Sequence, residues 1–474
     1  MPMNEKFRVG VLNIHSVATG RHILARLNEL NQSQWLDFDD LMDLQRDKLQ
    51  SLLQYAYQYV PYYRRTFDKV HFNPGDLGRD LANLSRIPIL TKAMVREHWN
   101  ELLTTEPKRL QKLSKLSTSG STGLPLIFMQ DADFRDSVTA DIQRHMGWAG
   151  WKLGEPQAVI WGAPFTSSRQ RQVRTHMIDW VWNRNQINAF MMTEQSMAAF
   201  AEQVRRKKAR ILFGYASSVQ RFAQFVQSSQ YKGLTFDGVF TGAELLLPLV
   251  REYLEETFQC QVFNHYGTNE LGGMACECAE HKGLHISVEN SYVEILKEGY
   301  PTRPGEVGDL VVTNLNNRGM PFIRYSIGDG AAWQTGEACL CGRASPRLSS
   351  VDGRRADAFR TMDGRSIWTG FTGAAFRCLV HPTIRQFQVV QKSLDQIMVR
   401  LVREGEVPPT TLEEITRTMK AAFGSGVRIT FEFPGEIPPL PSGKHQYAIS
   451  EVLPLSSDEL VKVPKDIEER ASVR

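Results

Sequence analysis

Near the end of the first quarter of the chain, residues 117–125 have the composition of a phosphate-binding loop. They read STSGSTGLP, and the apolar run Leu126 to Met129 follows directly. Glycine lets the backbone approach an anion closely, and successive N–H groups in such a turn form a concave anion site to which hydroxyls add donors. The lysine of the G-x-x-x-x-G-K-[ST] loop is absent, so this is not the P-loop of kinases and GTPases. A flexible Ser/Gly linker is the alternative interpretation.

Two pairs of cysteines form a second group of residues that could do chemistry. The first pair is Cys276-x-Cys278, with His281 shortly after it, and the second is Cys339-x-Cys341. Thiols and a histidine in two close clusters suit a tetrahedral structural zinc site. The expected ligands are Cys278, His281, Cys339 and Cys341, with Cys276 and His285 as substitutes. Buried free thiols are the alternative.

Length and composition are typical of a soluble protein with more than one domain. The 474 residues exceed one ordinary hydrophobic core, and 42% of them are hydrophobic and 23% charged. No apolar run approaches the roughly 18 residues of a membrane span, and residues 1–14 lack the apolar core of a signal peptide. We therefore expect a cytoplasmic protein without membrane insertion.

The charge of the chain argues against a nucleic-acid partner. The formal net charge is only +4, and the sharpest basic run, Arg205 to Lys208, has no aromatic residues interleaved with it. A solvated helix face explains that run better.

Strand-like and helix-like segments alternate through most of the chain. Helical patterns cover 38–60, where Pro61 follows, 132–149 and 195–208, and short apolar runs at 158–161 and 211–213 resemble buried strands. Such alternation favours an α/β architecture with a largely parallel sheet. Towards the end, alternating segments at 397–401 and 427–433 flank a helical pattern at 410–422, which predicts a small α+β unit. We place the boundary between a large domain, 1–353, and a small one, 354–474.

Three further segments complete a resemblance to a known family. They are NHYGTNE at 264–270, RYSIGD at 324–329 and PLPSGK at 439–444. Together with the Ser/Thr/Gly loop, and in this order, they resemble the adenylate-forming superfamily of acyl-CoA synthetases over residues 40 to 450. YVPYY at 59–63 and IPILTK at 87–92 resemble more specifically the phenylacetate-CoA ligase branch and its capsule-biosynthesis members.

The resemblance implies a large N-terminal domain of mixed and parallel sheets with helices, and a small mobile α+β C-terminal domain. It assigns contacts with ATP or AMP to Thr118, Ser119, Gly120, Ser121, Thr122, Gly123, Gly242, Ala243, Glu244, Tyr266, Gly267, Thr268, Asp329 and Arg354. It gives Glu270 the binding of Mg²⁺ and Lys444 the catalytic role of bridging the substrate carboxylate and the α-phosphate. Trp161, Phe213, Tyr215 and His265 are candidate walls of the acid pocket, although His265 could equally be a core histidine.

The implied activity is ATP-dependent conversion of an aryl or acyl carboxylic acid to an acyl-adenylate, followed by transfer to CoA as a thioester. Two alternatives stay open: transfer to an amine, hydroxyl or sugar instead, and a nucleotide-binding scaffold without catalysis. Departures from the family pattern at Asn269, Ser326 and Ala356 motivate the scaffold alternative, and the last also leaves the hinge residue open. The partners are then the acid, ATP and CoA; the identity of the acid and a homodimer both stay undecided.

Overall fold

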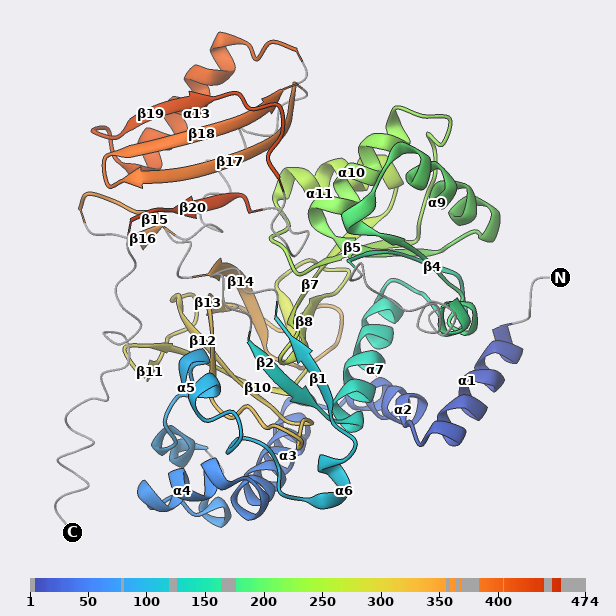
Figure 1. Cartoon of the computed structure of the whole chain (residues 1–474), viewed down its shortest axis with the longest axis vertical. Coiled ribbons are helices and arrows are strands. Elements are labelled where there is room, and N and C mark those ends of the chain that lie inside the picture. The colour runs from blue at the N-terminus through green and yellow to red at the C-terminus, as the bar shows by residue number, and fades with distance from the viewer. Residues whose placement is uncertain are drawn as a thin grey trace.

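The computed structural model describes residues 5–77, 81–118, 126–162, 176–354, 359–363, 366–367, 383–403, 405–438 and 446–452. They form a mixed α/β protein with one large sheet, flanking helices and a smaller C-terminal sheet, so the predicted fold class is confirmed (Figure 1). In this part of the chain no helix has the length and apolar character needed to cross a bilayer.

A sheet of twelve strands forms the centre of the large part, and five of its strands run parallel. These are β3 (Gln157–Trp161), β4 (Arg184–Asn188), β5 (Ile211–Tyr215), β6 (Gly238–Gly242) and β7 (Gln261–Thr268). One face packs against α9 (Glu194–Lys207), α10 (Ala216–Gln227) and α11 (Pro248–Phe258). The other face packs against α7 (Ala132–Trp148), whose Met146 contacts the aromatic side chains of that face.

The remaining seven strands are antiparallel and continue the sheet beyond β7. They are β8 (Gly272–Glu277), β9 (Leu284–Ile286), β10 (Ser291–Lys297), β11 (Tyr300–Pro301), β12 (Gly308–Asn314), β13 (Tyr325–Trp333) and β14 (Arg347–Arg354). A second core joins them to the hairpin of β1 (Ser114–Ser117) and β2 (Ile127–Gln130) and to the helices α3 (Phe38–Tyr59) and α4 (Pro61–Lys69).

Shorter elements complete the N-terminal part. The helices are α1 (Glu5–Thr19), α2 (Ile23–Ser33), α5 (Lys92–Glu97) and α6 (Pro107–Leu110), and 3₁₀ turns lie at Pro74–Asp76, Ala82–Arg86 and Ala189–Met191. Local side chains fix several helix starts: Asp37, Asp131 and Thr193 accept a hydrogen bond from a backbone N–H in the first turn of α3, α7 and α9.

Among the described residues, the C-terminal unit contains a four-stranded sheet and the helix α13 (Pro409–Phe423). The strand order is β19-β18-β17-β20, with β17 (Ile384–Ser393), β18 (Gln396–Arg403), β19 (Arg428–Glu432) and β20 (Ala448–Ser450). Helix α13 connects the parallel pair β18 and β19, and a two-residue hairpin, β15 (Phe359–Arg360) and β16 (Ser366–Ile367), precedes the sheet. The sequence predicted β18, α13 and β19 but not β17, the strand that makes the unit a sheet.

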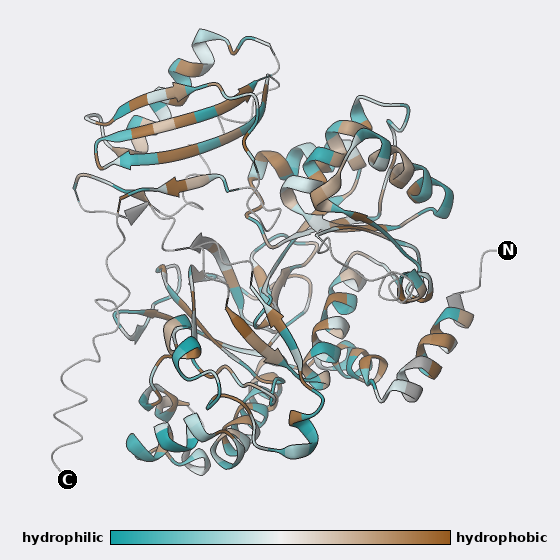
Figure 2. Ribbon diagram, viewed as in Figure 1, coloured by the Kyte–Doolittle hydropathy of each residue, from teal (hydrophilic) through white to brown (hydrophobic). Residues whose placement is uncertain are grey.

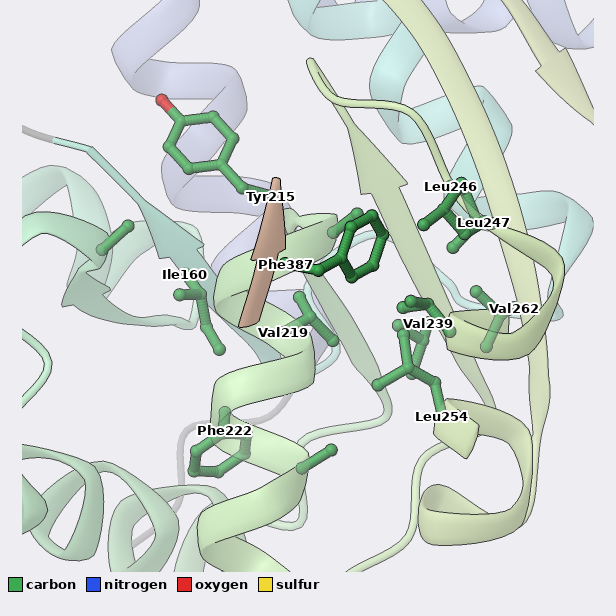
Figure 3. Packing of buried hydrophobic residues seen from close by; sticks show 14 of the residues in the cluster. Ile160, Tyr215, Val219, Phe222, Val239, Leu246, Leu247, Leu254, Val262 and Phe387 are labelled. Atoms are coloured by element: carbon green, nitrogen blue, oxygen red, sulfur yellow. The ribbon is translucent and has the colours of Figure 1, made fainter. Parts of the chain in front are cut away.

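The C-terminal unit packs on the helical face of the parallel strands. Phe387 of β17 belongs to the same buried cluster as Val219 of α10 and the Leu246–Leu247 segment (Figure 3). The predicted domain boundary at residues 353 and 354 coincides with the last two residues of β14, and it stays a prediction.

Truncating the centre of this cluster should destabilise the large part of the chain. Phe222 is fully buried between Phe200 and Phe258, with ring centroids 5.2 and 6.2 Å away. We expect Phe222→Ala to lower the free energy of unfolding of the large part by about 3–5 kcal/mol. Equilibrium unfolding in urea measures this loss. Leu394→Ala, at an exposed position between β17 and β18, is the control; an equal loss in both variants would contradict the assignment of the core.

Candidate functional site

The carboxyl ends of the parallel strands bring together residues from four separate parts of the sequence. β3 ends at Trp161, β5 at Tyr215 and β6 at Gly242, and β7 carries His265 and Tyr266 beside them. Between β7 and β8 the sheet changes from parallel to antiparallel. In open α/β sheets ligands bind outside the carboxyl ends of the strands, so this edge is the candidate functional site.

An aromatic wall lies at that edge. The ring of Trp161 is 4.2 Å from Tyr215 and 5.3 Å from Phe213, centroid to centroid, and Phe213 is 5.7 Å from His265. The structure therefore brings the four predicted pocket residues together in a row, each ring next to the following one. Their role in binding an acid stays a prediction.

Two of the family-like segments meet through a hydrogen bond. The Tyr266 hydroxyl on β7 donates to Asp329 Oδ2 on β13 at 2.6 Å. Arg354, on β14, is the register partner of Asp329, so the backbones of these two residues lie side by side. Three predicted nucleotide contacts thus lie together although they are far apart in the sequence.

The segment after β6 has an unusual backbone. Ala243 has a φ of +64°, a left-handed conformation that residues with a Cβ adopt rarely and that clusters at functional sites. The Glu244 carboxylate accepts hydrogen bonds from the Ser217 backbone N–H at 2.8 Å and from its hydroxyl at 3.0 Å. This capping of α10 fixes the turn at the strand end. Gly242 suits this position because a Cβ would lie 3.0 Å from the His265 carbonyl oxygen, a tight contact.

Thr118 closes the base of the Ser/Thr/Gly loop. Its backbone N–H donates to the Leu126 carbonyl at 2.9 Å, and its hydroxyl accepts from the Leu126 N–H at 3.0 Å. The two ends of the loop are therefore held together by the β1–β2 hairpin. Ser119, Gly120, Ser121, Thr122 and Gly123 lie outside the described residues, as does Lys444.

Glu270, the expected magnesium ligand, lies in the turn between β7 and β8. Gln130 of β2 donates to the Asn269 carbonyl at 2.7 Å, and the Thr268 hydroxyl accepts from the Leu271 N–H, so the turn is tied to the strand that follows the phosphate-type loop. The Glu270 residue is only 6% exposed. A carboxylate in this turn, beside the strand that follows the phosphate-type loop, is suited to a hard cation. Gly267 fits the turn because a Cβ would lie 2.5 Å from the Gly272 carbonyl oxygen.

Two buried histidines lie behind the aromatic wall. His145 of α7 and His265 have ring centroids 5.3 Å apart, and burial lowers the pKa of each. Both are therefore neutral near pH 7. Within the described ranges, Nε2 of His265 has no hydrogen-bond partner, and the His265 ring lies against Gly273, where a Cβ would come within 3.1 Å of it. His265 is thus a buried wall residue with one free ring nitrogen.

The cysteine pairs come together as expected, but with a different histidine. One ligand atom from each of Cys278, His285, Cys339 and Cys341 lies within 4.8 Å of the other three. The Sγ atoms of Cys278 and Cys339 are 3.6 Å apart, and Cys341 Sγ is 3.3 Å from His285 Nε2. Three sulfurs and one imidazole in this arrangement fit tetrahedral Zn²⁺.

The structure does not place His281, the histidine expected as a ligand, beside the cysteines. Its ring faces Arg251 and Glu277, with Nδ1 3.1 Å from Arg251 Nη1, and stacks near Phe263 at 5.3 Å. His281 lies in the turn after β8 with a φ of +49°, which directs it away from the cysteines. Cys276, the other substitute, is buried against α7 instead. Residue spacing could not distinguish His281 from His285, because the turn and the start of β9 decide which one faces the thiols.

The surroundings of His285 suit a metal ligand. Its Nδ1 is 3.0 Å from the Ser345 hydroxyl, which orients the ring and leaves Nε2 facing Cys341. Burial, with Arg343 and Arg347 nearby, lowers the pKa of His285 to about 4, so the neutral imidazole that binds metals is present near pH 7.

Comparison with known proteins gives relatives along nearly the whole chain. Residues 359–451 match the family model of the CapK C-terminal domain. Protein CapK of Staphylococcus aureus is 24% identical over 435 residues, covering 90% of this chain and 92% of CapK. The phenylacetate-coenzyme A ligase of Thermus thermophilus is 27% identical over 67% of this chain and 71% of its own length. The corresponding enzyme of Escherichia coli is 25% identical over 69% and 74%.

Solved structures share the fold. The 2-hydroxyisobutyryl-CoA ligase in its postadenylation state superposes with a TM-score of 0.73 at 18% identity, over 93% of this chain and 94% of that one. The chain is thus similar to adenylate-forming CoA ligases in sequence and in fold. Its relatives place it beside the phenylacetate-CoA ligases and CapK. The open conformation of the same 2-hydroxyisobutyryl-CoA ligase superposes with a TM-score of 0.57 at 19% identity.

Sequence analysis missed a buried ionic network behind the site. Arg144 of α7 pairs with Asp141 at 2.5 Å and with Glu289 at 2.7 Å, and the Ser287 hydroxyl donates to Asp141 at 2.8 Å. A signal was present: the polar residues Asp141, Arg144 and His145 lie three and four apart, on one face of a helix. On an otherwise buried helix such a polar face predicts buried partners.

The buried histidines should make stability depend on pH. In the unfolded chain a histidine has a pKa of about 6.5, whereas burial lowers the pKa of His145 and His265 in the folded state. Below about pH 6.5 the unfolded state binds more protons than the folded state. Lowering the pH by one unit should therefore reduce the free energy of unfolding by about 1 kcal/mol per histidine. Thermal unfolding at about pH 7.5 and about pH 5.5 measures this.

The variant His265→Leu should reduce that acid-induced loss. His176→Gln, at an exposed position, is the control and should leave the pH dependence unchanged. An identical pH dependence in wild type and His265→Leu would show that His265 gains a proton as readily in the folded state as in the unfolded one.

Proposed function

We propose that this protein activates a carboxylic acid with ATP, forming an acyl-adenylate that is then transferred to CoA as a thioester. The observation that carries the proposal is the hydrogen bond between Tyr266 and Asp329, which joins two nucleotide-binding segments of the superfamily at the carboxyl edge of the sheet. The relatives support the same chemistry, since several are phenylacetate-CoA ligases and a structural neighbour was solved with acyl-AMP and CoA.

Within this proposal several residues together stabilise the negative charge that develops during the reaction. Attack of the carboxylate on the α-phosphate expels pyrophosphate, and negative charge is crowded in that transition state. Fixed donors and cations therefore supply most of the catalysis. Loop residues 118–123 would bind the terminal phosphates, Glu270 would hold Mg²⁺, and Asp329 would accept hydrogen bonds from the ribose.

Lys444 would be the cation that meets the acid at the α-phosphate. Tyr447, three residues further along the chain, is half-buried, and the Glu244 carboxylate contributes to the raised pKa of its hydroxyl. Glu244 lies in the segment assigned to the adenine and ribose pocket. The described chain directly after Lys444 is therefore close to the nucleotide segment, which supports delivery of this lysine by the C-terminal unit.

The aromatic wall supports an aryl acid as the substrate class. Trp161, Phe213 and Tyr215 present ring surfaces that favour stacking with an aromatic group. The free nitrogen of His265 adds one hydrogen-bonding group to an otherwise apolar wall, the usual composition of a specific small-molecule site.

Removal of the proposed cation should abolish activation but not nucleotide binding. We expect Lys444→Ala to slow acid-dependent ATP–pyrophosphate exchange by at least about a hundredfold, with ATP affinity nearly unchanged. The exchange is first measured in wild type over a panel of aryl, fatty and amino acids, and the best substrate is then used for the variants.

Lys420→Ala is the matched control, since this lysine lies exposed on α13 of the same unit. Unchanged exchange in Lys444→Ala would refute the role of Lys444, and ATP binding without exchange for any acid would favour the scaffold alternative. CoA should accelerate AMP release; if it does not, the acceptor is an amine, hydroxyl or sugar.

We also propose that Cys278, His285, Cys339 and Cys341 hold a structural Zn²⁺. Three thiolates and one imidazole leave no open position on a tetrahedral ion, so the metal would bind the β8–β9 turn to the 339–341 segment rather than take part in catalysis.

The zinc content of two variants tests whether His285 or His281 is the metal ligand. Protein purified without chelator should contain about one zinc ion per chain, and His285→Ala should lose most of it and unfold at a lower temperature. His281→Ala is the matched control and should retain zinc, because its ring lies apart from the thiols. Wild-type protein without zinc by mass spectrometry, or loss of zinc only in His281→Ala, would contradict the assignment.

A further inference from the structure

Helix α1 leaves two large apolar side chains exposed. Its buried face carries Arg8, Leu12 and Ser16, while Phe7 and Ile14, two turns apart, point outward and are 56% and 71% exposed. The helix lies at the periphery of the molecule beside the N-terminus, and Figure 2 shows hydrophobic residues along it. A soluble protein that covered this helix with its own core would bury Phe7 and Ile14 instead.

A second segment with exposed apolar side chains contacts α1 through Arg8. The Nη1 of Arg8 donates to the Trp180 carbonyl oxygen, and its guanidinium lies 5.7 Å from the centre of the Trp180 ring. Trp180 and Met177 of the helical residues 176–181 are themselves 54% and 64% exposed. Phe7, Ile14, Met177 and Trp180 are called the α1 patch below.

A cluster of cations borders the α1 patch. The C-terminal end of α9 carries Arg206, Lys207 and Lys208, all exposed. Arg8 and Arg206 both contribute to the lowered pKa of Lys207, so the end of α9 lies close to α1. Asp179 also lies near Lys207, but it is paired with Arg184 at 2.5 Å and offsets little of this positive charge.

We propose that the α1 patch and the end of α9 dock this protein on an anionic lipid surface. Aromatic and aliphatic side chains that insert at the headgroup boundary, next to lysines and arginines that attract acidic lipids, are the two components of interfacial membrane binding. A protein partner would need acidic groups around an apolar groove, whereas a lipid surface meets both requirements at once. Because no described helix is suited to span a bilayer, this attachment is peripheral.

The test measures flotation of the full-length protein with vesicles of phosphatidylcholine, with and without phosphatidylglycerol. Wild type should bind the anionic vesicles and not the neutral ones, and added salt should weaken binding. Phe7→Ser with Ile14→Ser should weaken binding by at least about tenfold, and Arg206→Glu with Lys208→Glu by about 25-fold or more. Unchanged acid-dependent ATP–pyrophosphate exchange in both variants confirms that they are folded.

Two matched controls carry the same chemical changes elsewhere. Arg417→Glu with Lys420→Glu reverses two exposed charges on α13, and Leu394→Ser removes an exposed apolar side chain. Both should bind vesicles like wild type. Absence of binding to anionic vesicles, or equal losses in controls and variants, would overturn the proposal. A dimer in light scattering that Phe7→Ser with Ile14→Ser converts to a monomer, without vesicle binding, would assign the patch to a second copy of the chain and overturn it as well.

Discussion

The buried guanidinium of Arg144 is the interaction on which much of the large part depends. It pairs with Asp141 on its own helix and with Glu289, which lies between β9 and β10. Glu289 is also reached by the Ser33 hydroxyl of α2, and its carbonyl oxygen accepts from Lys48 of α3 at 2.7 Å. An uncompensated buried charge is strongly destabilising. The N-terminal helices, α7 and the antiparallel half of the sheet are therefore bound into one body.

Because α7 is fixed in this way, it connects the two candidate sites. On one side its His145 contacts His265 of the aromatic wall, and on the other its Trp148 lies 4.6 Å from His145 and 5.9 Å from the metal-type ligand His285. Trp148 also stacks under Arg343, just after the Cys339–Cys341 pair, with the guanidinium 4.4 Å from the ring. Through Trp148, the cysteine group therefore contacts the same helix that lies behind the proposed acid site.

The elements of the fold could be predicted more fully than the sites they position. Local periodicity and end signals predicted α3, α7, α9 and α13 to within about two residues, because a helix start depends on neighbouring residues. The sequence favoured His281 over His285 as a metal ligand because the choice rested on residue spacing alone. The path of the turn brings His285 to the thiols instead. The partners Arg144 and Glu289 are 145 positions apart in the sequence, and nothing local connects them. Short spacings predict short-range geometry; the convergence of distant segments requires the tertiary structure.

In the proposed nucleotide site, the hydrogen bond between Tyr266 and Asp329 would order two of the binding side chains before the nucleotide arrives. A carboxylate has room for about four hydrogen bonds, and the tyrosine hydroxyl uses one of them on Oδ2. The remaining lone pairs can still accept from both ribose hydroxyls, while the tyrosine prevents the carboxylate from rotating. The same contact fixes the Tyr266 ring, which would stack on adenine. This hydrogen bond therefore orients both side chains. Their conformational entropy is lost on folding, so it is not lost again when a nucleotide binds.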